Sequence, residues 1–151
     1  MVNFIANNED SLIRLRQFAA GLTPDALRKE VGAGWTVAGL LLHMAFWDRR
    51  ASTLLARWAK DGVDDSPIDG DVVNDSLKDL LQAIPPESAM RIALQAAEEV
   101  DGAIAGLGHS IIVEIESKPT HFKLDRAHHR TIHLDEMERA LQRARRAAAK
   151  S

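Results

Sequence analysis

The sequence predicts an all-α fold, a bundle of four principal helices with long connections, in a single domain over residues 1–151. Apolar residues recur every three to four positions through most of the chain, which is the period of an amphipathic helix. Only the run from Ile111 to Ile115 resembles a strand. So short a run cannot make a sheet alone, and we expect an extended connection or a small local pairing there. With 46% hydrophobic residues, a chain of 151 residues can bury one core.

The first helix is predicted near the N-terminus, where an apolar stripe has helical spacing. Thr23 is a favourable N-cap and Pro24 a favourable first helical residue, so a second, short helix is expected to continue to Val31. Gly32 and Gly34 then break the helical pattern. The stripe of the first helix comprises Leu12, Leu15, Ala19 and Leu22.

The clearest helix is expected to begin after Thr36, which can cap it, and to end near Gly62. Its apolar residues cover so much of the helix surface that burial against more than one neighbour is expected. His43 lies inside that surface, between Leu40 and Trp47. An imidazole is therefore expected in the interior of the bundle.

Four further segments complete the predicted order of elements. Residues 63–71 are acidic and contain a proline and a glycine, which is typical of a loop. A short helix is predicted over residues 72–84, where two prolines end it, and a longer helix over residues 87–107. The last helix is expected to begin between residues 120 and 126 and to continue to about Ala148.

The composition excludes several classes of function. The chain has no cysteine, which removes disulfides, zinc–thiolate sites and a cysteine nucleophile, and this fits a reducing cytoplasm. The net charge of −3 gives no reason to expect nucleic acid as a partner, and neither a signal peptide nor a membrane span is predicted. We interpret the basic run at the C-terminus as a solvated helix end, and the alternative is a basic tail that contacts anions; the run comprises Arg143, Arg145, Arg146 and Lys150.

Three of the six histidines form a candidate metal site. His129 and His133 are four residues apart, so both imidazoles lie on one face of the last helix, about 5–6 Å apart at Cβ. His43 is the third candidate, because it too lies on the apolar side of a long helix. Three neutral imidazoles leave a divalent cation an open coordination position, as catalytic sites do. We therefore predict a divalent metal at these residues, and nitrogen ligands favour nickel, copper or zinc over manganese and iron.

The other three histidines are predicted to lie outside the site. His109 lies in a glycine-flanked turn and His121 follows a proline segment, so both are expected to be exposed. His128 points about 100° away from His129 around the helix. For the candidate ligands themselves an alternative stays open, since a buried histidine is usually satisfied by a carbonyl or a carboxylate without any metal.

Neighbouring residues add to the candidate site. Asp125 lies one turn before His129 and is a candidate to orient its free ring nitrogen. Glu136, three residues after His133, is a candidate fourth ligand or catalytic general base. Trp47 is a candidate wall of a pocket. Solvated helix charges and a core tryptophan are the alternative interpretations of these positions.

Several motifs together resemble the DinB-like superfamily. The first is a Trp-Ser/Thr…His motif, matched here by Gly34-Trp35-Thr36 with His43 and Trp47. The second is a C-terminal motif, matched by His129 and His133 with the Leu134-Asp135-Glu136-Met137 that follows. A looser match is Asn74, at an asparagine often found before the third major helix. The resemblance covers nearly the whole chain in order and spacing.

The resemblance implies a DinB-like four-helix bundle with long connections, often a homodimer, in which three histidines hold a divalent ion. Those positions match His43, His129 and His133. The superfamily includes mycothiol-dependent maleylpyruvate isomerases and bacillithiol S-transferases, in which the metal activates a low-molecular-weight thiol, and another branch hydrolyses an electrophilic toxin without a metal. This chain departs from the family at Gly39, where an acidic residue often completes a capping box, and over residues 108–124, which do not align.

The expected function follows from the site and the resemblance. We expect a metal-dependent thiol S-transferase, isomerase or hydrolase that activates a low-molecular-weight thiol or water for attack on an electrophilic small molecule. In the hydrolase version, Glu136 or Asp125 accepts the proton. The alternative is a non-catalytic dimeric helical bundle that binds a ligand or partner. Neither version involves nucleic acid or a membrane.

Overall fold

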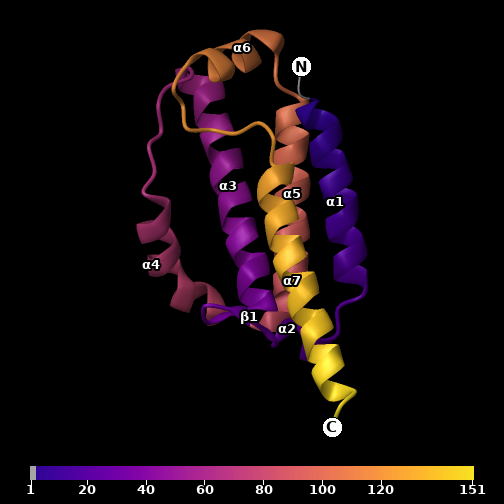
Figure 1. Ribbon diagram of the computed structural model, residues 1–151. Helices are drawn as coiled ribbons and strands as arrows, with labels where there is room; N and C mark the ends of the chain where they lie inside the picture. Colours follow the sequence, from indigo (N-terminus) through magenta and orange to yellow (C-terminus); the bar gives the residue numbers. More distant parts are fainter. Residues whose placement is uncertain (1–2) are drawn as a thin grey trace.

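The computed structural model describes residues 3–151, so the first two residues of the predicted domain lie outside the described residues. Within residues 3–151 the chain forms seven α-helices, one short 3₁₀ helix and a hairpin of two short strands, which confirms the predicted all-α class. None of the helices in this described part is long and apolar enough to cross a membrane. Four long helices lie lengthwise beside one another (Figure 1): α1 (Phe4–Ala20), α3 (Val37–Asp61), α5 (Ala89–Ala105) and α7 (Ala127–Ala148).

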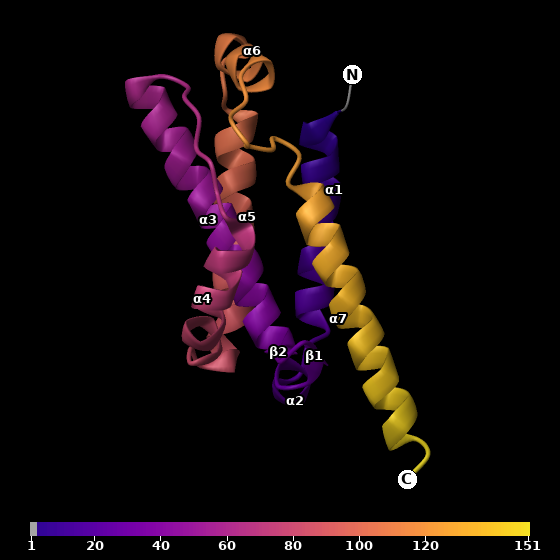
Figure 2. The ribbon, with the colours of Figure 1, turned by 60° about the vertical axis from the view of Figure 1, so that its left-hand side comes forward.

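The long helices pack in a definite order. α3 packs most extensively on α5, α5 also contacts α1, and α1 packs along α7. Figure 2 shows α3, α4 (Gly70–Gln82) and α5 on one side and α1 with α7 on the other. The C-terminal end of α7 extends beyond the other elements (Figure 2). α3 and α7 contact each other less extensively than α1 and α7 do, and the candidate site lies between them.

The core consists of two apolar clusters along α3 and α5. The first includes Leu41 of α3 and Met137 of α7, and the second surrounds Trp58 and Val100 toward the other ends of α3 and α5. Short side chains on the buried face of α5 allow the axis of α3 to approach closely. These residues are Ala89, Ala93, Ala96 and Ala97.

Two threonines cap the starts of α2 and α3, as predicted. The side chain of Thr23 accepts a backbone N–H at the start of α2 (Pro24–Leu27), and that of Thr36 does the same for α3. α3 ends before Gly62, whose φ of 93° lies in the left-handed region that glycine adopts without a Cβ clash.

The predicted extension of the second helix to Val31 is wrong. α2 ends at Leu27, and the chain then forms an antiparallel hairpin of β1 (Glu30–Gly32) and β2 (Trp35–Thr36). Ala33 and Gly34, between the strands, have φ of 51° and 77°. Positive φ at both positions matches the two-residue turns whose twist suits a hairpin. The Gly-Ala-Gly segment therefore reverses the chain and does not merely end a helix.

The predicted extended segment from Ile111 to Ile115 is also wrong, because these residues belong to α6 (His109–Ser117). Ile111 and Ile115 are four residues apart and share one helical face. Both join the second apolar cluster, in which Ile115 is buried. α6 crosses the end of the long helices (Figure 1). Isoleucine and valine favour strands, but this preference depends on packing, and burial of one helical face outweighs it here.

The remaining boundaries agree closely with the predictions. α4 begins at Gly70, at the end of the predicted loop, and ends at Gln82, before the two prolines. The helix predicted from residue 87 begins as a 3₁₀ turn, Pro86–Ser88, and continues as α5. α7 begins at Ala127, immediately after the range predicted for its start.

Candidate metal centre

The three predicted ligand residues meet between α3 and α7. His43 belongs to α3, whereas His129 and His133 occupy successive turns of α7. The Nε2 atom of His129 lies 3.2 Å from Nε2 of His43 and 3.1 Å from Nε2 of His133. Ligand nitrogens of the three rings all lie within 4.8 Å of one another. The three imidazoles can therefore hold one metal ion.

The donor set fits a divalent ion on two counts. In a tetrahedral complex with metal–nitrogen bonds of about 2.0–2.1 Å, two ligand nitrogens are about 3.3 Å apart. The two separations of 3.2 and 3.1 Å are close to that value. A neutral imidazole nitrogen either donates or accepts a hydrogen bond, so three of them cannot all be satisfied by one another. A single cation accepts all three lone pairs.

Glu136 fixes the orientation of His133. Its Oε2 lies 2.8 Å from Nδ1 of His133, across one turn of α7. Because a carboxylate only accepts hydrogen bonds, Nδ1 carries the proton and Nε2 presents its lone pair to the other two histidines. The Glu136 side chain is 44% exposed and lines the same cavity as the histidines. Its predicted role as general base stays a prediction.

Burial keeps two of the imidazoles uncharged. Burial and the neighbouring His133 lower the pKa of His43 to about 4. Burial, together with the charges of the other two histidines, Arg126 and Arg130, lowers the pKa of His129 to about 2. Both rings are therefore neutral near pH 7, with lone pairs available to a metal ion.

The predicted contact between Asp125 and His129 is wrong. Asp125 accepts hydrogen bonds from Nδ2 of Asn7 at 2.8 Å and from the backbone N–H of Ala127 at 2.9 Å. The expectation fails because α7 begins only at Ala127, so Asp125 lies outside the helix and the spacing of one turn does not apply. Nδ1 of His129 is buried and has no hydrogen-bond partner within residues 3–151.

The histidines lie in the wall of an open cavity of about 850 Å³. α3 and α7 form two of its sides, and the hairpin of β1 and β2 contributes Trp35 and residues 31–33. The ring centroid of His43 is 5.5 Å from that of Trp35 and 6.4 Å from that of Trp47. Both indoles line the cavity, which confirms the placement predicted for Trp47.

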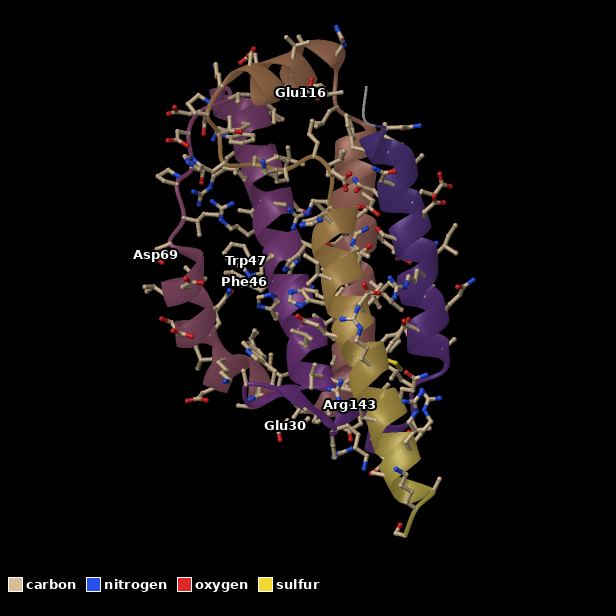
Figure 3. The ribbon with its side chains drawn as sticks, viewed as in Figure 1. Glu30, Phe46, Trp47, Asp69, Glu116 and Arg143 are labelled. Carbon is tan, nitrogen blue, oxygen red and sulfur yellow. The ribbon has the colours of Figure 1, made fainter. Side chains whose placement is uncertain are left out.

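Asn74 connects α4 to this wall. Its Oδ1 accepts a hydrogen bond from Nε1 of Trp47 at 2.9 Å, and both side chains line the cavity. Figure 3 shows Trp47 on the side of α3 that faces α4. Asn74, known from the sequence only as a loose family match, therefore orients an indole beside the histidines.

A buried arginine that was not predicted from the sequence connects the site to the other long helices. Arg130 is 0% exposed and pairs with Asp48 of α3 at 3.2 Å and with Asp101 of α5 at 2.7 Å. It also donates a hydrogen bond to Ser11 of α1. Burial opposes its charge, but hydrogen bonds and charges from Asp101 and Asp48 raise the pKa of Arg130 above its ordinary value. The residue beside His129 thus joins α7 to three other long helices.

Unlike Arg130, three other arginines, from α7 and its N-cap position, line the cavity. Arg126, at the N-cap of α7, donates to Asp48 at 3.0 Å. Arg139 and Arg143 line the cavity farther along α7, and Figure 3 shows Arg143 near the level of the hairpin. The interpretation of Arg143 as part of a solvated helix end is therefore incomplete, because the residue is exposed but also lines the cavity.

The other three histidines lie outside the cluster, as predicted. His109 and His128 are both exposed, but the predicted turn at His109 is wrong, because His109 is the first residue of α6. His121 is exposed in the segment before α7, with Nδ1 2.8 Å from Oδ1 of Asp65. The group of potential metal ligands found within residues 3–151 contains none of them.

Comparison of the chain with protein-family models, curated proteins and solved structures finds no match. The features that bear on function are therefore the three converging histidines, the cavity and the charges along it.

Proposed function

We propose that this chain is a metalloenzyme with a DinB-like four-helix bundle, in which His43, His129 and His133 hold nickel, zinc or a similar divalent ion. The observation that carries the proposal is the convergence of three imidazoles in the wall of an open cavity. Structural zinc sites are closed by a fourth protein ligand, whereas catalytic sites keep one position open. Three ligands beside an accessible cavity therefore favour a catalytic metal site over a structural one.

The proposed reaction is attack of a low-molecular-weight thiol or of water on an electrophilic small molecule. A divalent ion in this position supplies a Lewis acid, which lowers the pKa of a thiol or water and yields a nucleophile near neutral pH. The chain has no cysteine, so in the thiol version the sulfur arrives with a cofactor.

Glu136 has two tasks in this proposal. It holds the Nδ1 proton of His133, which keeps Nε2 of that ring available as a ligand. The same carboxylate is open to the cavity and can accept a proton from the incoming nucleophile. Trp35 and Trp47 line the same cavity beside His43 and present apolar surface to the electrophile.

Metal content, measured by inductively coupled plasma mass spectrometry, tests the site. We expect about one equivalent in the parent protein and at least about tenfold less in His129→Ala, because affinity depends steeply on ligand number. A matched control, His109→Ala/His121→Ala/His128→Ala, removes three exposed imidazoles and should keep the metal. A parent protein that takes up no nickel, zinc or manganese on reconstitution would contradict the proposed centre.

Thiol transfer tests the reaction. Metal-loaded protein should transfer bacillithiol, mycothiol or glutathione to monochlorobimane, and the fluorescent adduct should not form with His129→Ala. The variant lacking the three exposed histidines should retain the transfer. If none of the three thiols reacts with the loaded parent protein, the thiol version is wrong and hydrolysis by water becomes the version to test.

A non-catalytic dimeric bundle that binds a ligand or partner is the second candidate. Val72 and Leu80 of α4 are 58% and 68% exposed, and in this version they belong to the surface that the second chain or the partner covers. This candidate predicts association of two chains in multi-angle light scattering together with no turnover of any electrophile by metal-loaded protein.

A further inference from the structure

The charges along the histidine cavity are unbalanced. Arg126, Arg139 and Arg143 line it, and Glu136 is the one carboxylate among the lining residues. The carboxylate of Glu136 is engaged with His133. A cleft with an excess of one charge focuses its potential and concentrates ligands of the opposite charge.

Three carboxylates lie within four residues before Arg139 on α7; Glu136 is engaged by His133, and the other two by a different helix. Asp135 and Glu138 both pair with Arg14 of α1, at 2.6 and 2.8 Å. Asp135 occupies the i−4 position, from which a carboxylate on a helix ordinarily neutralises an arginine. Within residues 3–151 no salt bridge involves Arg139, whose side chain lines the histidine cavity and also a second hollow shared with Asp135 and Glu138.

Arg143 keeps most of its hydrogen-bond donors free. Its Nη2 donates to the backbone oxygen of Val31 in β1 at 3.4 Å, which places the guanidinium between α7 and the hairpin. A guanidinium has five N–H donors, so several remain for a ligand. Its i−4 neighbour is Arg139, so α7 supplies no carboxylate at that position. Paired N–H groups of this kind recognise carboxylate and phosphate oxygens.

Arg126 differs from these two, because Asp48 engages it. The unpaired cations therefore lie at the end of the cavity away from the start of α7. Ten residues of helix separate His133 from Arg143, a rise of about 15 Å. The hairpin spans the same interval, since Val31 contacts Arg143 and Trp35 lies beside His43.

We infer that the substrate of this cavity is a small organic oxyanion, a carboxylate or a phosphate ester. Its anionic group binds Arg139 and Arg143, and its apolar part lies along Trp35 toward the histidines. The inference rests on the proposed function only in taking this cavity as the site of reaction. It assigns a class of substrate, an elongated molecule with the reactive group at one end and a negative charge at the other.

Titrations observed by nuclear magnetic resonance test the inference on the full chain. The indole N–H signals of Trp35 and Trp47 report on the cavity, and that of Trp58, in the second apolar cluster, is an internal control. The probes are 4-phenylbutyrate, 4-phenylbutyl phosphate and the neutral 4-phenylbutyramide, added to metal-free and to zinc-loaded protein. We expect an anion to shift the Trp35 and Trp47 signals and to bind about tenfold more tightly than the amide, the size of a charge-assisted hydrogen bond.

Two double variants of α7 distinguish binding by Arg139 and Arg143 from a general effect of positive charge. Arg139→Ala/Arg143→Ala should bring the ratio of anion to amide affinity close to one, whereas Arg145→Ala/Arg146→Ala, with the same change in net charge, should preserve it. Both pairs are exposed, so the fold tolerates either change. The two anions distinguish a carboxylate site from a phosphate site, and preference for either supports the inference.

Three outcomes would overturn it: equal affinity for anions and amide, a preference that survives in Arg139→Ala/Arg143→Ala, or no shift of the Trp35 and Trp47 signals by any probe. A preference seen in metal-free protein that takes up no zinc would sustain the anion site while the proposed metal centre fails. The two proposals therefore fail separately.

Discussion

Gln82 of α4 completes the N-cap of α3 by accepting the backbone N–H of Thr36 on its Oε1 at 2.9 Å. In a capping box, the side chain three residues after the cap performs this task. That position is Gly39, whose N–H bonds to the Thr36 hydroxyl. A Cβ on Gly39 would lie 2.8 Å from Oε1 of Gln82. A side chain at residue 39 and the contact from α4 therefore exclude each other.

Substitutions of Gly39 and Gln82 are expected to be strongly coupled. Gln82→Ala should lower the free energy of unfolding by about 1–2 kcal/mol, because it removes hydrogen bonds to Thr36 and Gly34. Gly39→Ala should not increase the free energy of unfolding of the parent protein, because the new Cβ collides with Gln82. In the Gln82→Ala protein it should increase that free energy by about 0.5–1 kcal/mol, since alanine favours helix. Urea unfolding of the parent, the two single variants and the double variant measures the coupling. Additive effects would show that residue 39 and Gln82 do not compete for space.

Loss of the buried guanidinium should be among the most damaging single changes. Arg130→Ala leaves Asp48 and Asp101 without their main partner in the interior. We expect a loss of about 3–5 kcal/mol in the free energy of unfolding, which is typical of breaking a buried ion pair from one side. Arg16→Ala is the control, because its pair with Glu98 is about half exposed and should contribute less than about 1 kcal/mol. Denaturant titrations that give similar losses for the two variants would refute the structural role of Arg130.

Two substitutions of Glu136 separate its proposed tasks. Glu136→Gln retains an amide oxygen that can accept the Nδ1 proton of His133, but it cannot take up a proton from a nucleophile. It should keep the metal and lose turnover. Glu136→Ala should also weaken metal binding by about 10–100-fold, because the second ring nitrogen of His133 loses its partner. Competition with a chelator measures the metal affinity, and unchanged turnover in Glu136→Gln rules out the general-base role.

The metal-free protein should lose stability as the pH falls below about 6.5. The pKa values of His43, about 4, and His129, about 2, lie below the ordinary value of 6.5, so the unfolded chain binds more protons than the folded chain in this range. Well above pH 6.5 neither state binds these protons, and the dependence disappears. Each buried histidine contributes up to about 1.4 kcal/mol per pH unit to the slope of the free energy of unfolding against pH. This slope appears at a higher pH than the one at which most carboxylates titrate.

His129→Gln tests that slope. Urea unfolding between pH 7 and pH 5, in the presence of a chelator, should show about half the parent slope in this variant, since one of two buried histidines remains. His128→Gln removes an exposed imidazole and should keep the parent slope. Identical slopes in all three proteins would mean that burial of these rings does not control the acid response.

Much of the local structure follows from short stretches of sequence. The caps at Thr23 and Thr36 depend on contacts three residues apart, and the structure has both. The sequence does not predict the hairpin between β1 and β2 or the helix α6, for different reasons. Alanine rarely adopts a positive φ, so the residue type at position 33 does not indicate the two-residue turn. The apolar run at residues 111–115 fits a strand and a helix equally well.

The sequence by itself determined the long helices, their caps and the placement of His129 and His133 on one face, because these depend on interactions within about four residues. Only the tertiary structure decided that His43 meets that pair, that Gln82 caps α3, and that Arg143 borders the cavity. Those contacts join residues 86, 46 and 112 positions apart. They depend on which helix faces pack together, and a local pattern of residues does not encode that choice.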